Sequence, residues 1–185
     1  MLIIFDLNGV LLYREPRGYK KYHAEDRGFI ANRRTYVRPG AREFLLNLCL
    51  HHEVAIWSTA RYDNVLRMID AIGIDQKLFL FIWSGEQCFK TDSRDEKNKP
   101  LLIKPLSSVW IKFTAYNEFN TILIDDSRLK TNMNPETCMF VPDSFHDPDS
   151  GDTSLYPNGE FCTTLEHMAK KQKVINENME ENKDT

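Results

Sequence analysis

The first twelve residues constrain the fold of this chain more than any other stretch. Four apolar residues, Leu2–Phe5, run directly into Asp6, and Gly9 follows within a short turn. A continuous apolar run that ends in turn residues is typical of a strand buried on both faces of a parallel sheet. Asp6 would then stand at the carboxyl end of the strand, where open α/β sheets bind their ligands. The same residues also suit a core strand that merely ends in a polar turn.

Apolar strands and helices alternate along the rest of the chain. Further strands are predicted at residues 53–57, 77–83, 122–124 and 137–141, and Leu101-Leu102-Ile103 is expected to resume the core. Helical spacing of apolar residues follows Pro39 and recurs at 65–72, at 106–113 and from about residue 160. This alternation predicts an α/β domain over residues 1–170, with a Rossmann-like, mostly parallel sheet flanked by helices.

Composition sets the broad class of protein. A chain of 185 residues with a net charge of -3 is long enough for one globular domain with a sizeable core. The four cysteines form no Cys-x-x-Cys pair, which predicts reduced thiols in an intracellular protein, nuclear or cytoplasmic. No apolar run is long enough for a membrane span. Residues 171–185 are expected to form a polar C-terminal tail. We expect a monomer.

A basic, aromatic segment at about 13–37 follows the first strand. Eight lysines and arginines stand against three acidic residues between Leu12 and Gly40, and five aromatic side chains are interleaved with them. We expect a small flap inserted after the first strand, which would attract an anionic substrate. A hairpin packed on the edge of the domain is the alternative. The composition also suits nucleic acid, which we rank below a phosphorylated protein as a partner.

The polar residues that follow the predicted strands suggest a chemistry. Asp6, Asp125 and Asp126 can lie together only if positive charge neutralises them, and Lys104 supplies one such charge. Carboxylate oxygens suit Mg²⁺, which also binds water and substrate phosphate. Ser58 can donate a hydrogen bond to a phosphate oxygen. A carboxylate beside a metal ion and a lysine is a known type of nucleophile.

With these residues in view, the chain resembles the haloacid dehalogenase (HAD) superfamily of aspartate-based phosphatases. Within it, the resemblance is to the family that dephosphorylates the C-terminal domain of RNA polymerase II, also called the NLI-interacting-factor-like phosphatases. An Arg-Pro-Gly entry to the first helix is present at Arg38-Pro39-Gly40. The four motifs of the family resemble, in chain order, Asp6-Leu7-Asn8-Gly9-Val10, Trp57-Ser58-Thr59-Ala60, Lys104-Pro105-Leu106-Ser107 and Ile124-Asp125-Asp126-Ser127.

The resemblance implies a role for each of these residues. Asp6 would attack phosphorus and carry the phosphoryl group, while Asp125 would orient metal-bound water or the lysine. The phosphoryl oxygens would be held by Ser58, Thr59 and Lys104. Mg²⁺ would be bound by Asp6, Asp126 and the backbone carbonyl of Asn8. The implied substrate is a phosphoserine or phosphothreonine protein, with the RNA polymerase II tail as one candidate.

Asn8 is the departure that matters most. Members of the family normally carry a second aspartate here, which protonates the leaving oxygen and then activates water. An amide cannot shuttle a proton in this way. Three explanations stay open: a slow or specialised phosphatase, a phosphoprotein-binding pseudophosphatase, or an introduced trapping substitution. Pro105 and Arg128 also depart from the family pattern and leave the details of the substrate open.

Overall fold

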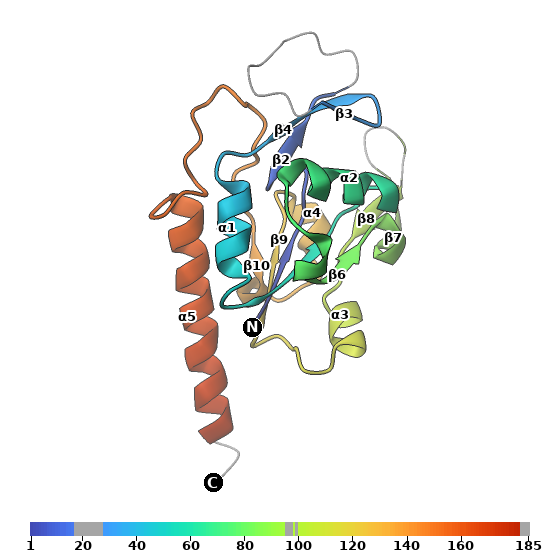
Figure 1. Cartoon of the computed structure of the whole chain (residues 1–185). Helices are drawn as coiled ribbons and strands as arrows, with labels where there is room; N and C mark the ends of the chain where they lie inside the picture. The colour runs from blue at the N-terminus through green and yellow to red at the C-terminus, as the bar shows by residue number, and fades with distance from the viewer. Residues whose placement is uncertain (17–27, 95–97, 99, 182–185) are drawn as a thin grey trace.

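The computed structural model describes residues 1–16, 28–94, 98 and 100–181, with the backbone alone for 176–181. Its centre is a five-stranded parallel sheet in the order β10-β9-β1-β5-β6 (Figure 1). The strands are β1 (Leu2–Phe5), β5 (Glu53–Trp57), β6 (Phe79–Trp83), β9 (Thr121–Ile124) and β10 (Met139–Phe140). The predicted α/β class with a mostly parallel sheet is confirmed.

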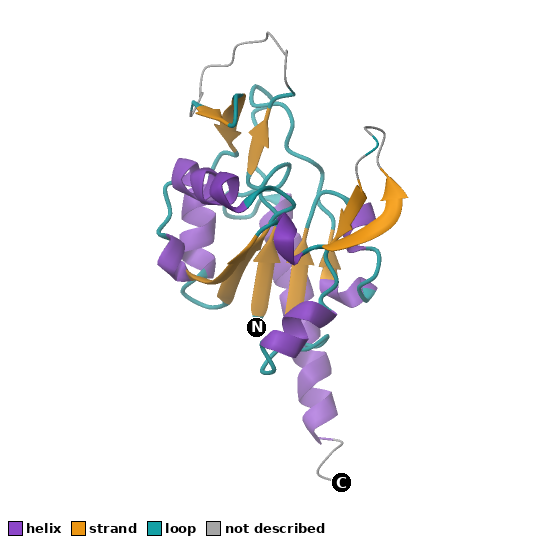
Figure 2. Ribbon diagram, turned by 90° about the vertical axis from the view of Figure 1, so that its right-hand side faces the viewer, coloured by secondary structure: helices purple, strands orange, loops and turns teal. Residues whose placement is uncertain are grey.

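Helices cover both faces of the sheet (Figure 2). Alternate residues of β1 point to opposite faces. Ile3 and Phe5 belong to a core shared with α1 (Ala41–Leu48), α2 (Tyr62–Ile72) and α5 (Glu160–Glu181). Leu2 and Ile4 belong to a second core shared with α3 (Ser107–Lys112). The polar groups that follow the strands are therefore held on a sheet packed on both sides.

A three-stranded antiparallel sheet follows β1 and lies beyond the carboxyl ends of the parallel strands (Figure 1). Its strands are β2 (Leu12–Arg14), β3 (Phe29–Ile30) and β4 (Arg33–Val37), in the order β2-β4-β3. They occupy the described parts of the segment predicted to be a flap. Residues 17–27 of that segment lie outside the described residues.

The expectation that Leu101–Ile103 resumes the core is confirmed only in part: Ile103 is buried and Leu102 packs against the second core, but these residues form no strand of the central sheet. These residues belong to β8 (Pro100–Ile103), which pairs antiparallel with β7 (Phe89–Arg94) in a separate hairpin. Leu101 and Leu102 are only half-buried, because one two-stranded ribbon cannot cover both of its faces. The hairpin nevertheless delivers Lys104 to the carboxyl end of the sheet.

The remaining elements are short, apart from the last helix. The short elements are η1 (Gln76–Leu78), η2 (Gly85–Gln87), α4 (Arg128–Thr131) and η3 (Glu136–Cys138). Helix α5 continues to Glu181, through much of the stretch that the sequence predicted to be a tail. Gln172 is buried and donates hydrogen bonds to the carbonyls of Thr121 and Thr137, at 3.0 and 2.8 Å, which ties α5 to the sheet. None of the helices in the described ranges has the length and apolarity needed to cross a membrane.

Candidate active site

Asp6 lies at the centre of a buried group of charged side chains. It follows β1 directly, its backbone N–H donates to the carbonyl of Ile124 at 2.8 Å, and it is 1% exposed. Because β1 and β9 are paired in parallel register, with Phe5 opposite Ile124, Asp125 emerges beside Asp6. The central sheet thus places two carboxylates side by side away from bulk water.

Asp126 completes a group of three carboxylates. One oxygen from each of Asp6, Asp125 and Asp126 lies within 4.8 Å of the others. Asp126 also accepts a hydrogen bond from Ser144 Oγ at 2.7 Å. Gly9 makes room for this side chain, since a Cβ atom there would stand 2.0 Å from Asp126 Oδ2. The turn after β1 therefore needs glycine for close approach.

Lys104 is the first positive charge in the group. Its side chain is fully buried, with Nζ 2.5 Å from Asp125 Oδ2 and 3.2 Å from Asp6 Oδ1. Asn134 donates to the carbonyl of Lys104 at 2.9 Å and accepts from the N–H of Leu106 at 2.7 Å. These contacts fix the chain on both sides of Pro105, so the ammonium group is held in place by buried structure.

Lys130 is a second positive charge, and the sequence analysis missed it. Its Nζ atom lies 3.2 Å from Asp6 Oδ2, 3.2 Å from Asp125 Oδ1 and 3.7 Å from Asp126 Oδ1. Lys130 stands four residues after Asp126, but in the sequence alone this spacing looks the same as that of an ordinary surface ion pair. The described site holds three carboxylates and these two ammonium groups.

The charges shift the proton affinities of the group. Burial alone would raise the pKa of Asp6, but the charges of Lys104 and Lys130 outweigh it and lower the value to about 2. Burial raises the pKa of Asp125 against the opposing charge of Lys104, and the charge of Asp6 adds to the rise. Burial would lower the pKa of Lys130, yet the three carboxylates raise it. Asp6 is therefore ionised at neutral pH.

Ser58 and Thr59 follow β5, the strand next to β1. Ser58 is buried, its N–H donates to the carbonyl of Trp83 at 3.0 Å, and its Oγ accepts from the N–H of Ala60 at 3.4 Å. Thr59 is half-buried. The parallel register of β1 and β5 puts both hydroxyl side chains on the edge of the sheet where Asp6 stands.

Asn8 is half-buried in the turn after β1. Its side-chain oxygen accepts a hydrogen bond from the backbone N–H of Arg14 at 3.0 Å. Because only the amide oxygen can accept from this donor, the NH₂ group is the part of the side chain left to face other groups. The side chain of Asn8 thus links the turn after β1 to β2, the first strand of the antiparallel sheet.

The donor set fits a small divalent cation. Three carboxylates with oxygens gathered in one place suit Mg²⁺, and Asp6 Oδ1 is a buried oxygen without a hydrogen bond, although Lys104 pairs with it electrostatically at 3.2 Å. Asp6 and Asp126 are the side chains that would hold the ion. Carboxylate, lysine and hydroxyl groups around a buried aspartate can act on a phosphate ester.

The chain is similar to several known proteins. Residues 1–175 match the model of the NLI interacting factor-like phosphatase family. An uncharacterized FCP1 homology domain-containing protein of Schizosaccharomyces pombe is 28% identical over 152 residues, which are 77% of this chain and 60% of that protein. A ubiquitin-like domain-containing CTD phosphatase 1 of Drosophila melanogaster is 25% identical over 104 residues, 55% of this chain and 32% of the relative.

Two solved structures share the fold. Fission yeast RNA polymerase II CTD phosphatase Fcp1 bound to beryllium fluoride gives a TM-score of 0.51 at 16% identity, over 98% of this chain and 55% of that one. A second structure of Fcp1, described as an essential RNA polymerase II CTD phosphatase, gives a TM-score of 0.52 at 15% identity. The match covers 95% of this chain and 51% of that one. At such identities the likeness shows the fold alone. The family match spans nearly the whole chain, and this protein belongs to the NLI interacting factor-like phosphatase family.

Proposed function

We propose that this chain is a Mg²⁺-dependent phosphatase that acts through an aspartyl phosphate on Asp6. The observation that carries the proposal is the position of Asp6, buried at a strand end between two lysines and beside two further aspartates. The relatives named as CTD phosphatases favour phosphoserine or phosphothreonine in a protein as the substrate. Such a substrate implies an intracellular location.

The first half of the reaction would use Asp6 as the nucleophile. An oxygen of Asp6 attacks phosphorus, the bond from phosphorus to the ester oxygen breaks, and the leaving oxygen keeps the electron pair. The low pKa of Asp6 keeps the attacking group ionised. Lys104 would neutralise the charge of the phosphoryl group, and Ser58 and Thr59 would donate to its oxygens. Asp6 and Asp126 would hold Mg²⁺, which would supply further positive charge.

The second half would return Asp6 to its carboxylate. Water attacks phosphorus, the bond between phosphorus and the oxygen of Asp6 breaks, and inorganic phosphate leaves. Water gives up a proton in this step, and the alkoxide from the first step needs one. Asn8 cannot exchange either proton, because its amide is neutral and its oxygen already accepts from Arg14. We therefore expect slow turnover, slowest for alkyl esters such as phosphoserine.

A second candidate is a phosphoprotein-binding pseudophosphatase. Asn8 favours it, since an amide can donate a hydrogen bond to a bound phosphate but cannot complete the reaction. The two candidates share the binding site and differ in turnover.

The test combines turnover with binding of fluoroberyllate, which forms an analogue of the aspartyl phosphate. Fluoroberyllate should bind the wild-type chain only with Mg²⁺ present, and Asp6→Asn should abolish both that binding and turnover of an aryl phosphate. Asp63→Asn, which removes an exposed carboxylate on α2, is the matched control. Full turnover in Asp6→Asn would contradict the assignment of the nucleophile.

Asn8→Asp separates the two candidates. If the site lacks only a proton shuttle, the substitution should raise kcat about 10²–10⁴-fold, with the larger gain on phosphoserine peptide. Intact-mass analysis must first exclude deamidation at Asn8-Gly9, because a small deamidated fraction would mimic weak native activity. An unchanged kcat for Asn8→Asp, in a sample shown to be folded and to bind Mg²⁺, would favour the pseudophosphatase.

A further inference from the structure

The ammonium group of Lys130 lies where the three carboxylates converge. It is 3.2 Å from Asp6 Oδ2, 3.2 Å from Asp125 Oδ1 and 3.7 Å from Asp126 Oδ1. These are the same three carboxylates whose oxygens gather within 4.8 Å. A divalent cation bound by Asp6 and Asp126 would need the space, and the negative charge, that Lys130 now uses.

The net charge of the group shows why the ammonium group of Lys130 and a divalent cation do not fit well together. Three carboxylates and the fully buried Lys104 leave a net charge of about -2, which one divalent cation neutralises. Lys130 reduces that charge to about -1. Mg²⁺ binds oxygens at about 2.0–2.1 Å, so an ion on Asp6 and Asp126 would stand close to the ammonium group and be repelled by it.

The backbone of Lys130 is fixed, while its side chain has a route to solvent. Its carbonyl accepts from the N–H of Lys104 at 2.8 Å, and its own N–H donates to the carbonyl of Ser127 at 3.0 Å. The next residue, Thr131, is buried. The side chain of Lys130 is 22% exposed, in contrast to the fully buried Lys104. Rotation about its side-chain bonds can therefore carry the ammonium group outward without moving α4.

We propose that Lys130 is a built-in competitor for the divalent cation. Its ammonium group holds the carboxylates together in the metal-free chain and moves outward when Mg²⁺ binds. The apparent affinity for Mg²⁺ is then the intrinsic affinity multiplied by the fraction of chains whose Lys130 is displaced. The inference rests on the proposed function only in taking Asp6 and Asp126 as the Mg²⁺ ligands.

The test measures Mg²⁺ affinity by titration calorimetry at fixed ionic strength. Lys130→Gln removes the charge and keeps most of the side chain, and we expect its affinity for Mg²⁺ to rise at least about tenfold, as for an inward state favoured about 10:1. Lys130→Arg keeps a competing charge and should stay near wild type. Lys77→Gln, in the exposed turn η1 that precedes β6 and so at the opposite end of the strands from Asp6, controls for the loss of one positive charge.

A second measurement uses the wild-type chain, so that it does not depend on the folding of a variant. In spectra of ¹³C-labelled lysine, the signal absent from Lys130→Arg identifies Lys130. Saturating Mg²⁺ should move this signal to the position of a solvent-exposed lysine. An unmoved signal, or a Lys130→Gln affinity that is unchanged or lower, would overturn the inference. Neither result would touch the proposed function, which depends on Asp6 in the fluoroberyllate and turnover tests.

Discussion

At the scale of single residues, Gly9 decides how closely the turn after β1 can approach Asp126. Its φ of 91° is costly for any residue with a Cβ atom, and such an atom would also meet Asp126 Oδ2 at 2.0 Å and Ser144 Oγ at 2.9 Å. Gly28 has a similar φ of 86° with nothing within 4 Å of the same position. Substitutions at these two glycines can therefore separate the energetic cost of backbone strain from the cost of steric contact.

We expect Gly28→Ala to lower the free energy of unfolding by about 1 kcal/mol, from backbone strain alone. Gly9→Ala should cost about 1–3 kcal/mol more, because the added atom must push Asp126 aside. The measurement is urea unfolding of both variants, with Mg²⁺ titration of the folded samples. Equal losses, with unchanged Mg²⁺ binding, would show that the contact with Asp126 is unimportant.

The residues around Asp6 differ in how readily the sequence points to them. Asp6, Asp125 and Asp126 stand directly after apolar strands, and Lys104 after an apolar run, so their convergence could be predicted from the α/β pattern. Lys130 could not, because it lies within a polar stretch where a pair with Asp126 looks like any surface ion pair. Its contacts with Asp6 and Asp125 exist only once β1 and β9 are paired.

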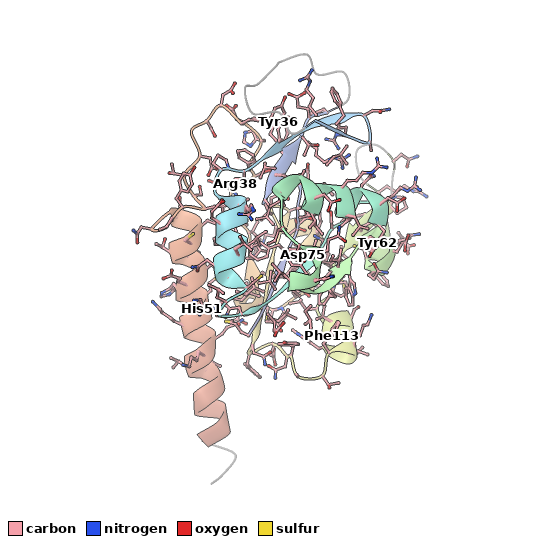
Figure 3. All side chains as sticks on the ribbon, viewed as in Figure 1. Tyr36, Arg38, His51, Tyr62, Asp75 and Phe113 are labelled. Atoms are coloured by element: carbon pink, nitrogen blue, oxygen red, sulfur yellow. The ribbon has the colours of Figure 1, made fainter. Side chains whose placement is uncertain are left out.

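At the scale of elements, the antiparallel sheet is held by internal contacts that give its two neighbouring arginines different roles. Arg33 donates to the carbonyls of Glu15 and Arg14, and so ties β4 to β2 and the residue after it. Arg34 stacks over the exposed ring of Phe29, with 5.1 Å between the guanidinium carbon and the ring centre. Figure 3 shows Tyr36 on the same strand; its hydroxyl donates to Glu15 at 3.2 Å.

Arg34→Gln should raise KM for a phosphopeptide about 3- to 10-fold and leave KM for a small aryl phosphate unchanged. The reason is that a charge on this sheet can contact the peptide beyond the phosphate but not a compact substrate. Steady-state kinetics with both substrates provide the check. Arg33→Gln is the comparison, since losing its backbone contacts should lower stability. If Arg34→Gln changed KM equally for the phosphopeptide and the aryl phosphate, the antiparallel sheet would have only a structural role.

The hairpin of β7 and β8 shows where sequence patterns fall short for elements. Three consecutive apolar residues before Lys104 resemble a core strand, and periodicity cannot distinguish a strand of the central sheet from a ribbon beside it. The pairing of strands decides the matter: Ile103 pairs with Phe89, a residue next to a polar and charged stretch of the sequence. Such long-range pairing has no local signal.

At the scale of the whole molecule, Arg38 joins the turn after β1 to the long loop before α5 (Figure 3). It donates to the carbonyl of Val10 at 3.0 Å and, from Nη2, to Asp152 at 2.8 Å, and it is 3% exposed. Burial would raise the pKa of Asp152, but the hydrogen bond and charge of Arg38 lower it. This ion pair ties distant parts of the chain together.

Asp152→Asn should lower the free energy of unfolding by about 2 kcal/mol at neutral pH, the loss of a charged hydrogen-bond partner. A lowered native pKa stabilises the fold above the unfolded value, near 3.8, and this contribution disappears as pH falls through the native pKa. The difference in the free energy of unfolding between Asp152→Asn and the wild type should therefore be constant above about pH 5 and shrink below about pH 4. Urea unfolding across this range tests it; a difference independent of pH would contradict the role of ionised Asp152.

The α/β class could be predicted because its strands and helices are separately periodic in the sequence. The strand order could not, since nothing local in Leu2–Phe5 says that its neighbours are Glu53–Trp57 and Thr121–Ile124. The loop of residues 142–159 contains neither helix nor strand, and its contacts with Gly9, Arg38 and Asp126 could not be predicted from the sequence.

The central position of β1 has a consequence for how the chain is made. This wholly apolar strand is synthesised before both of its neighbours, and β9 follows only after β5, β6 and the hairpin. A nascent chain that ends between Trp83 and Thr121 would carry β1 with one edge of unpaired backbone groups, open to strands of other chains. Partial translation products of this protein should accordingly aggregate until residues 121–124 have emerged from the ribosome and closed the sheet.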